Sequence, residues 1–306
     1  MKLSYFFKIV SNKLGLKSIA LHVYFKLLGL KYGVKLFKQD GRVSLIKHDK
    51  KIIIKHGAYD FGASGLVIRD FDAFFNSVEF ENHNGYKVVD YSCLRRHKML
   101  NIDEFYWSHG IIDPEIVTKI YLNYSKIGFG SIVLDVGTYS GVQTVRFSKI
   151  VGNTGKVYAF EPDKESFETL LMNLSEHKCD NVIALNYGLY DFDGVLCFNS
   201  SGGMGAGIDM NGIDEIVVKT LSTAVRELKI DKIDFIKMDI EGSEIPVLTS
   251  GREILRKFKP RLIVEPHYIN GRLNDKEIMI EMISTGYKCE IVAQGEFDHQ
   301  PLLYFF

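Results

Sequence analysis

The stretch "VLDVGTYSG" at residues 133–141 is the part of the sequence that decides the fold. An apolar run carries Asp135 near its end, and Gly137 and Gly141 follow four positions apart. The helical pattern "VQTVRFSKI" comes next. Glycine allows the backbone to bend sharply and to approach a neighbour closely. The stretch therefore predicts a strand, a tight turn with room for a ligand, and a helix.

Strand-like and helix-like patterns alternate from this stretch to the end of the chain. Such alternation is typical of a parallel sheet with helices on both faces. The last two apolar runs are joined by a connection too short for a crossover helix, so we expect them to pair as an antiparallel hairpin. The sequence thus predicts an α/β fold with a doubly wound, mostly parallel sheet of seven strands and an antiparallel last strand. The apolar runs are 131–136, 155–160, 181–186, 233–239, 261–266, 286–293 and 301–306.

Three regions divide the chain of 306 residues. The pattern of residues 1–57 predicts a basic helix followed by a β-hairpin over 41–57, and together these would form an N-terminal α+β appendage. Residues 58–112 are rich in aromatic residues and histidine but lack periodicity, so a substrate-facing role and a purely structural one both stay open. Asp113, a suitable helix N-cap, opens a ligand-binding domain over 113–306.

The charge of the N-terminal region points to an anionic partner. Residues 1–57 carry thirteen Lys and Arg against two acids, although the whole chain is neutral. Leucines and aromatics between lysines at 18–30 fit a helix on an anionic membrane surface, but a helix packed on the protein's own core gives the same pattern and is the interpretation that we favour. The segment is too short to span a bilayer and contains Lys26. No motif for reading nucleic acid accompanies the charge, so we do not expect nucleic acid as a partner.

Cysteine usage indicates the compartment. The four cysteines are scattered, with no C-x-x-C pair and no secretory signal. This pattern favours a reducing environment over a disulfide framework. We therefore expect a cytoplasmic protein. The basic N-terminal region leaves a peripheral location on a membrane as the alternative.

The glycine turn also discriminates between cofactors. The dinucleotide fingerprint needs a further glycine where the pyrophosphate approaches, and Tyr139 lies between the two glycines instead. Glu161 ends the next predicted strand, twenty-four residues after Gly137. A carboxylate at that place can accept hydrogen bonds from both hydroxyls of a ribose. The residues thus favour a ligand that has a ribose but no phosphate.

Four segments together resemble a known family. They are the glycine turn, "FEP" at 160–162, "IDFIKMDIEGSEIPVLTSG" at 233–251 and "KPRLIVEPH" at 259–267. In this combination the chain resembles the FkbM-type S-adenosylmethionine-dependent methyltransferases, over roughly residues 113–306. "KMDIEGSE" is the most specific part. The resemblance implies a class I, Rossmann-like fold and S-adenosyl-L-methionine as the cofactor.

The resemblance also implies a set of cofactor-binding residues at the strand ends. Glu161 would hold the ribose, and Asp239 would face the methyl group. Tyr139 departs from the family, which more often has Asn at this position. The other implied positions are Asp135, Gly137, Tyr139 and Gly141 beside the methionine part, and Asn186 and Gly188 beside the adenine.

Acids and a histidine follow the fourth and fifth predicted strands. Methyl transfer from a sulfonium gains mainly from alignment and from removal of the acceptor's proton. Asp239 ends the fourth strand and Glu241 follows it, and Glu265 and His267 lie at the end of the fifth. We regard these four as the catalytic candidates, with His267 as a proton acceptor beside an acid. Glu244, near a helix start, is expected to stabilise the helix dipole or to lie on the surface.

The same four side chains suit a divalent cation, because oxygen and imidazole ligands would converge from two strand ends. No compact ligand motif accompanies them, so the sequence leaves the metal open.

We expect a methyltransferase that O-methylates a hydroxyl of a sugar, a glycan precursor or a small molecule, and this acceptor comes from the resemblance alone. The alternatives are an NAD-linked Rossmann oxidoreductase and a non-catalytic module that binds a membrane or nucleic acid.

Overall fold

A computed structural model describes most of the chain and divides it into two compact units. The units are residues 1–114 and residues 115–306. The described residues are 17–55, 64–65, 67–98, 104–108, 110, 115–200, 207–208, 212–269, 271–293 and 301–306.

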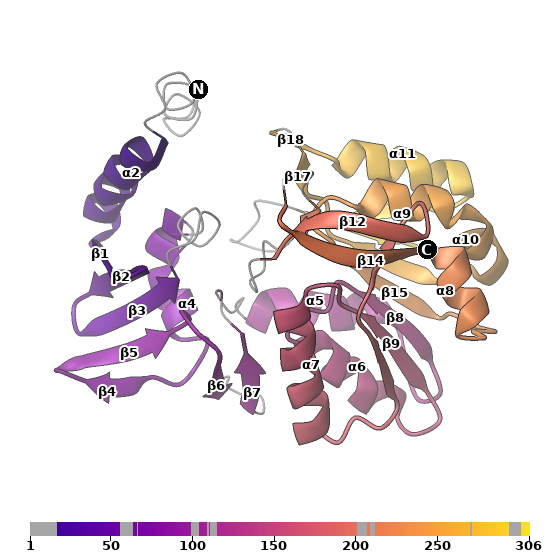
Figure 1. The fold of residues 1–306 in the computed structure, drawn as a ribbon, viewed down its shortest axis with the longest axis horizontal. Helices are drawn as coiled ribbons and strands as arrows, with labels where there is room; N and C mark the ends of the chain where they lie inside the picture. The colour runs from indigo at the N-terminus through magenta and orange to yellow at the C-terminus, as the bar shows by residue number, and fades with distance from the viewer. Residues whose placement is uncertain are drawn as a thin grey trace. The chain divides into compact units, whose positions relative to one another are not determined.

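The N-terminal unit combines a long helix with a five-stranded sheet of order β1-β2-β3-β5-β4 (Figure 1). Strands β2 and β3 pair antiparallel on either side of His48 and Asp49, which confirms the predicted hairpin. The elements are α2 (Lys17–Tyr32), β1 (Lys35–Gln39), β2 (Arg42–Lys47), β3 (Lys50–Lys55), α4 (Phe71–Phe75), β4 (Glu81–His83), β5 (Tyr86–Asp90), β6 (Arg95–Lys98) and β7 (Glu104–Trp107). Among the helices that the structure describes, none has both the length and the apolar character needed to cross a bilayer.

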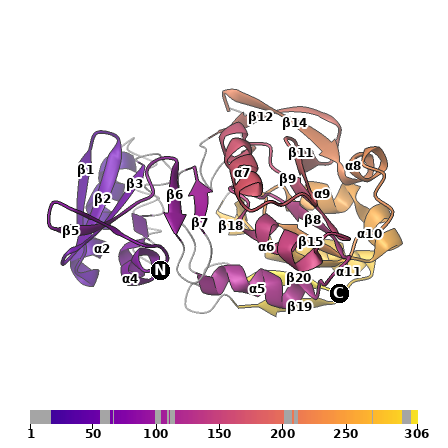
Figure 2. The same cartoon turned by 90° about the horizontal axis from the view of Figure 1, so that it is seen from below.

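A seven-stranded sheet of order β10-β9-β8-β15-β16-β20-β19 forms the centre of the C-terminal unit (Figures 1 and 2). The strands run parallel except β20, which is antiparallel to both of its neighbours. This confirms the predicted fold class, the doubly wound sheet and its reversed last strand. The strands are β8 (Ile132–Val136), β9 (Lys156–Phe160), β10 (Val182–Leu185), β15 (Phe235–Met238), β16 (Arg261–Val264), β19 (Cys289–Val292) and β20 (Leu302–Phe305).

Helices cover both faces of this sheet because its central strands are apolar on both sides. Leu134 and Val136 pack in one core with α8 to α11, and Val133 packs in the other with α5 and α6. Helix α7 lies beside α6. The predicted N-cap Asp113 lies outside the described residues. The helices are α5 (Glu115–Ser125), α6 (Val142–Val151), α7 (Lys164–Glu176), α8 (Leu221–Glu227), α9 (Glu244–Ser250), α10 (Arg252–Phe258) and α11 (Asp275–Thr285).

A second sheet, of order β11-β14-β12-β13, is inserted between β10 and α8. The sequence pattern did not predict this sheet. A Cβ on Gly207 of β13 would lie 3.5 Å from the Cβ of Glu241, so this sheet borders the acids that follow β15. The added strands are β11 (Gly188–Tyr190), β12 (Gly194–Asn199), β13 (Gly207–Ile208) and β14 (Asp214–Thr220), and a hairpin β17 (Tyr268–Ile269) and β18 (Arg272–Leu273) follows β16.

The winding of the large sheet reverses between β8 and β15, and the glycine turn lies there. Gly137 follows β8 with φ +78, and a Cβ on it would lie 1.7 Å from the carbonyl oxygen of Asp239. Gly141 has φ +84, and a Cβ there would lie 2.3 Å from Cδ1 of Leu170. These two glycines therefore make room for the end of β15 and for α7. Packing within the protein therefore already requires glycine at both positions of the turn.

We predict that Gly137→Ala destabilises the protein far more than Gly130→Ala. Both glycines have positive φ, but the nearest atom to a Cβ on Gly130 is Thr154 Oγ1 at 3.5 Å. The control variant should lose roughly 1 kcal/mol of unfolding free energy for the left-handed backbone alone. Gly137→Ala adds a clash with backbone and should lose at least about 3 kcal/mol. Urea denaturation followed by circular dichroism measures both, and equal losses would contradict the packing argument.

Candidate functional site

Glu161 joins the end of β9 to the glycine turn. Its side chain is buried and accepts hydrogen bonds from the backbone N–H groups of Tyr139 at 2.7 Å and Asp163 at 3.0 Å. Tyr139 has φ +51, a left-handed conformation that a tyrosine rarely adopts, so the first bond helps to hold a strained turn. Burial raises the pKa of Glu161 to about 7, although both backbone hydrogen bonds oppose this. Each carboxylate oxygen keeps a lone pair for another donor.

Asn186 and Gly188 lie beside Glu161, at the end of β10. The Nδ2 of Asn186 donates to the backbone carbonyl of Glu161 at 2.9 Å, which ties the third strand end to the second. A Cβ on Gly188 would meet Pro162 Cβ at 3.6 Å, an ordinary contact. Packing around position 188 therefore does not demand glycine.

A buried lysine connects the turn to the end of β15. Lys237 is 4% exposed, and its Nζ lies 3.8 Å from Asp135 Oδ1 and 3.3 Å from Asp239 Oδ2. It also donates to the carbonyl of Gly137. Burial opposes its charge, but the carboxylates of Asp239 and Asp135 outweigh this and raise the pKa of Lys237. Sequence reasoning missed this residue, although a lysine inside the apolar strand "DFIKMD" was the available signal.

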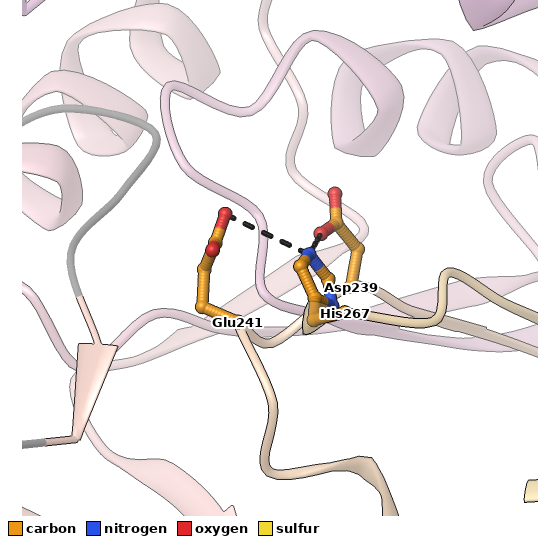
Figure 3. A group of neighbouring side chains, drawn as sticks. All are labelled: Asp239, Glu241 and His267. Carbon is orange, nitrogen blue, oxygen red and sulfur yellow. Dashed lines mark ion pairs between the residues drawn. The ribbon is translucent and has the colours of Figure 1, made fainter. Parts of the chain in front are cut away.

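Three of the four predicted catalytic side chains converge beside that lysine (Figure 3). His267 Nε2 lies 3.5 Å from Asp239 Oδ1 and 3.7 Å from Glu241 Oε1. One ligand-type atom from each of the three side chains falls within 4.8 Å of the others. Glu241 has φ +51, so this acid, like Tyr139, occupies a left-handed position that few L-residues adopt. The carboxylates of Asp239 and Glu241 remain 30% and 31% exposed and can be reached by a small molecule.

Glu244 and Asn274 hold the ring of His267 in place. Glu244 begins α9, as predicted, but it is fully buried, so the expectation of a surface position is wrong. Its carboxylate accepts from His267 Nδ1 at 2.8 Å and from Asn274 Nδ2 at 2.8 Å. Asn274 Oδ1 in turn accepts from the backbone N–H of His267 at 2.8 Å. The ring is therefore fixed with Nε2 toward Asp239 and Glu241.

The acids around His267 shift proton equilibria. Burial opposes a charge on the imidazole, but the hydrogen bond to Glu244 and the charges of Glu241 and Asp239 outweigh it and raise the pKa of His267 to about 10. Burial, with the repulsion of the neighbouring carboxylates, raises the pKa of Glu241 to about 8, against the attraction of His267. Near neutral pH these raised pKa values favour protons on His267 and Glu241, and His267 accepts another proton only after it loses its own.

Glu265, the fourth predicted residue, lies at the end of β16 but has a different partner. Its Oε2 accepts a hydrogen bond from the hydroxyl of Tyr121, on α5, at 2.6 Å. It is not one of the three residues whose ligand-type atoms gather around His267. Sequence reasoning also missed Tyr121, because its partner lies 144 residues away in the chain.

Parts of the chain are similar to two curated methyltransferases. Over 71 residues it is 31% identical to a probable cobalt-precorrin-6B C(15)-methyltransferase (decarboxylating) from Sulfurisphaera tokodaii, covering 23% of this chain and 37% of the relative. Over 100 residues it is 36% identical to a protein-L-isoaspartate O-methyltransferase from Methanococcus maripaludis, covering 29% and 47%. The chain thus spans less than half the length of these curated relatives.

A family model gives the family, and one solved structure of the same name is similar to part of the chain. The crystal structure of methyltransferase FkbM from Methylobacillus flagellatus is similar with a TM-score of 0.49 and 20% identity, covering 62% of this chain and 48% of that one. The sequence model described as "Methyltransferase FkbM domain" matches residues 135–289, from the glycine turn to β19. This match takes in just over half of the chain, including Glu161, Asp239 and His267. The chain therefore belongs to the FkbM methyltransferase family.

Proposed function

We propose that this protein is an S-adenosylmethionine-dependent methyltransferase that methylates a hydroxyl of a sugar, a glycan precursor or a small molecule. The observation that carries the proposal is the hydrogen bond from the Tyr139 N–H to Glu161, which joins the glycine turn to the carboxylate on the next strand. Family membership supports methyl transfer as the chemistry. The hydroxyl acceptor is an inference from the family and from the side chains around His267.

The polar groups of the turn fit this cofactor. The hydroxyls of Thr138 and Ser140 are buried and, among the described residues, have no hydrogen-bond partner. Buried polar groups are normally satisfied, so such hydroxyls suit a polar ligand. Glu161 has free lone pairs on both oxygens and would bind the ribose hydroxyls. Asp135, Gly137, Tyr139 and Gly141 would border the methionine part, and Asn186 and Gly188 the adenine.

The reacting groups would meet beside Asp239. When bound, S-adenosyl-L-methionine supplies a methyl group already activated by a positively charged sulfur. The protein then has to align the acceptor hydroxyl and take its proton. Asp239 is our first choice as the proton acceptor, because the raised pKa of His267 favours a proton on its ring near neutral pH. Glu241 and Glu265 are nearby acids that would assist, and Lys237 would orient Asp239.

The surface next to the cluster supports a sugar-like acceptor. Tyr268 and Ile269 directly follow His267 and are 59% and 42% exposed. An exposed aromatic and an aliphatic side chain beside polar groups offer both the apolar area and the hydrogen bonds that a sugar ring needs. Methyl-donor assays on a panel of glycans, sugar nucleotides and small alcohols would identify the acceptor. A folded protein that methylates none of them would contradict this part of the proposal.

We predict that cofactor affinity depends on pH through Glu161. Its pKa is raised to about 7, so the carboxyl is protonated below that pH and loses acceptor capacity for the ribose. Affinity for S-adenosylhomocysteine, the demethylated product, should be about tenfold lower at pH 6 than at pH 8. Isothermal titration calorimetry across this range measures it.

Two variants make this test specific. Glu161→Gln should bind weakly at every pH with little pH dependence, because the amide cannot ionise. Glu168→Gln, an exposed acid on α7, should behave like the wild type. Wild-type affinity that is constant from pH 6 to pH 8, or full affinity in Glu161→Gln, would overturn the ribose assignment. No heat at any pH from a folded protein would overturn the cofactor itself.

We also propose that α2 contacts an anionic membrane surface. Phe25 is 3% exposed and packs within the N-terminal unit, whereas Val23, Leu27 and Leu30 are 44%, 50% and 79% exposed. Their spacing puts these three on one helix face. The exposed Lys26 flanks this face. An exposed apolar stripe bordered by lysines suits the headgroup region of an anionic bilayer.

Vesicle flotation tests this contact. The protein should float with vesicles of phosphatidylcholine and phosphatidylserine, and floating should fall as salt rises because the charges are screened. Leu27→Glu and Leu30→Glu should each reduce the bound fraction severalfold. Ile213→Glu, at a residue of the other unit that is 95% exposed, serves as the control and should float normally. Absent or salt-insensitive flotation would remove the proposal.

A further inference from the structure

Two carboxylates and an imidazole from two strand ends point at one another across a short distance (Figure 3). We propose that Asp239, Glu241 and His267 bind one divalent metal cation that accepts both oxygen and nitrogen ligands, such as Mn²⁺. A cation lies about 2.1 Å from each ligand atom, so the ligands of one ion are about 3 to 4 Å apart. The separations of 3.5 Å and 3.7 Å from His267 Nε2 to the two carboxylates match this spacing.

The tautomer of His267 supports a cation at this place. Its Nδ1–H donates to Glu244 at 2.8 Å, so the neutral ring presents the lone pair of Nε2 toward Asp239 and Glu241. A cation that takes the place of a proton on Nε2 would be held by this lone pair and by both carboxylates, so that three ligand atoms share one positive centre.

The residues that hydrogen-bond to His267 are arranged as in known metal sites. A histidine that binds a metal commonly donates its other N–H to a carboxylate, which fixes the ring and raises its basicity. Glu244 performs this role from a fully buried position, and Asn274 holds both Glu244 and the backbone of His267. The ring orientation is therefore set by residues that are not themselves in the proposed ligand set.

The ligand set also limits the choice of metal. Carboxylates suit Mg²⁺, Ca²⁺ and Mn²⁺, whereas imidazole suits the transition metals, so a mixed set favours Mn²⁺ or a similar ion. Three protein ligands leave coordination positions open, on the side where Asp239 and Glu241 are partly exposed. Use of an open position to hold and acidify an acceptor hydroxyl rests on the proposed function. Binding of the cation does not.

Electron paramagnetic resonance titration with Mn²⁺ tests the site on the full-length, metal-stripped protein without cofactor. We expect one Mn²⁺ per chain. Glu241→Gln and His267→Gln should each weaken binding by at least about tenfold, because each removes a ligand atom. Glu168→Gln, an exposed acid on α7, should bind like the wild type. Glu241 is partly exposed, so its variant should fold, and circular dichroism checks this.

Glu244→Gln tests the positioning role. It leaves all three ligands in place, and we expect affinity for Mn²⁺ to fall by about ten- to a hundredfold. The site is overturned if the folded wild type binds no Mn²⁺ at millimolar concentration, or if Glu241→Gln and His267→Gln keep wild-type affinity. Calorimetry with S-adenosylhomocysteine on the same samples separates the proposals. Cofactor binding without Mn²⁺ binding removes only the metal site, and Mn²⁺ binding without cofactor binding supports the metal site and contradicts the proposed function.

Discussion

The candidate site depends on one buried ammonium group at the point where the large sheet reverses its winding. Lys237 lies in β15 between Asp135 and Asp239 and donates to the carbonyl of Gly137. Burying an unpaired charge in such a place costs on the order of several kcal/mol of folding free energy. The lysine therefore requires its carboxylates, and the carboxylates require the lysine. This mutual dependence fixes the ends of two neighbouring strands. Lys237 thus connects Asp239, the proposed proton acceptor, to the turn that we propose binds the cofactor.

Backbone packing reinforces the same connection. The turn at Gly137 approaches the carbonyl of Asp239 so closely that only a hydrogen atom fits between them. Glu161 then holds the turn from the other side through the N–H of Tyr139. The proposed ribose carboxylate, the turn and Asp239 therefore form one connected unit. Movement of any of these parts would displace the others.

Local pattern was enough to predict the large sheet. The apolar runs, the helices between them and the short final connection are properties of neighbouring residues, and together they gave the strands and the reversed β20. The sheet formed by β11 to β14 was missed, because its pairings join short runs whose alternation is weak. Glu244 was misjudged and Lys237 was missed for another reason. Charged residues are usually exposed, and the partners of these buried two include residues distant in sequence, Asn274 for Glu244 and Asp135 for Lys237.

Under the proposed function, the charges beside Asp239 would affect the rate of methyl transfer. The donor sulfur is positive before the transfer and neutral after it, so nearby carboxylates stabilise the starting state more than the transition state. Asp239, Glu241 and Glu244 would then slow the reaction if their charge stayed uncompensated. Lys237 offsets one of them, and a proton on His267 offsets a second. A cation held by Asp239, Glu241 and His267 would offset the rest and would also stabilise the negative charge that develops on the acceptor oxygen. The excess of acids in this cluster is therefore easier to reconcile with catalysis when it holds a metal than when it holds protons alone.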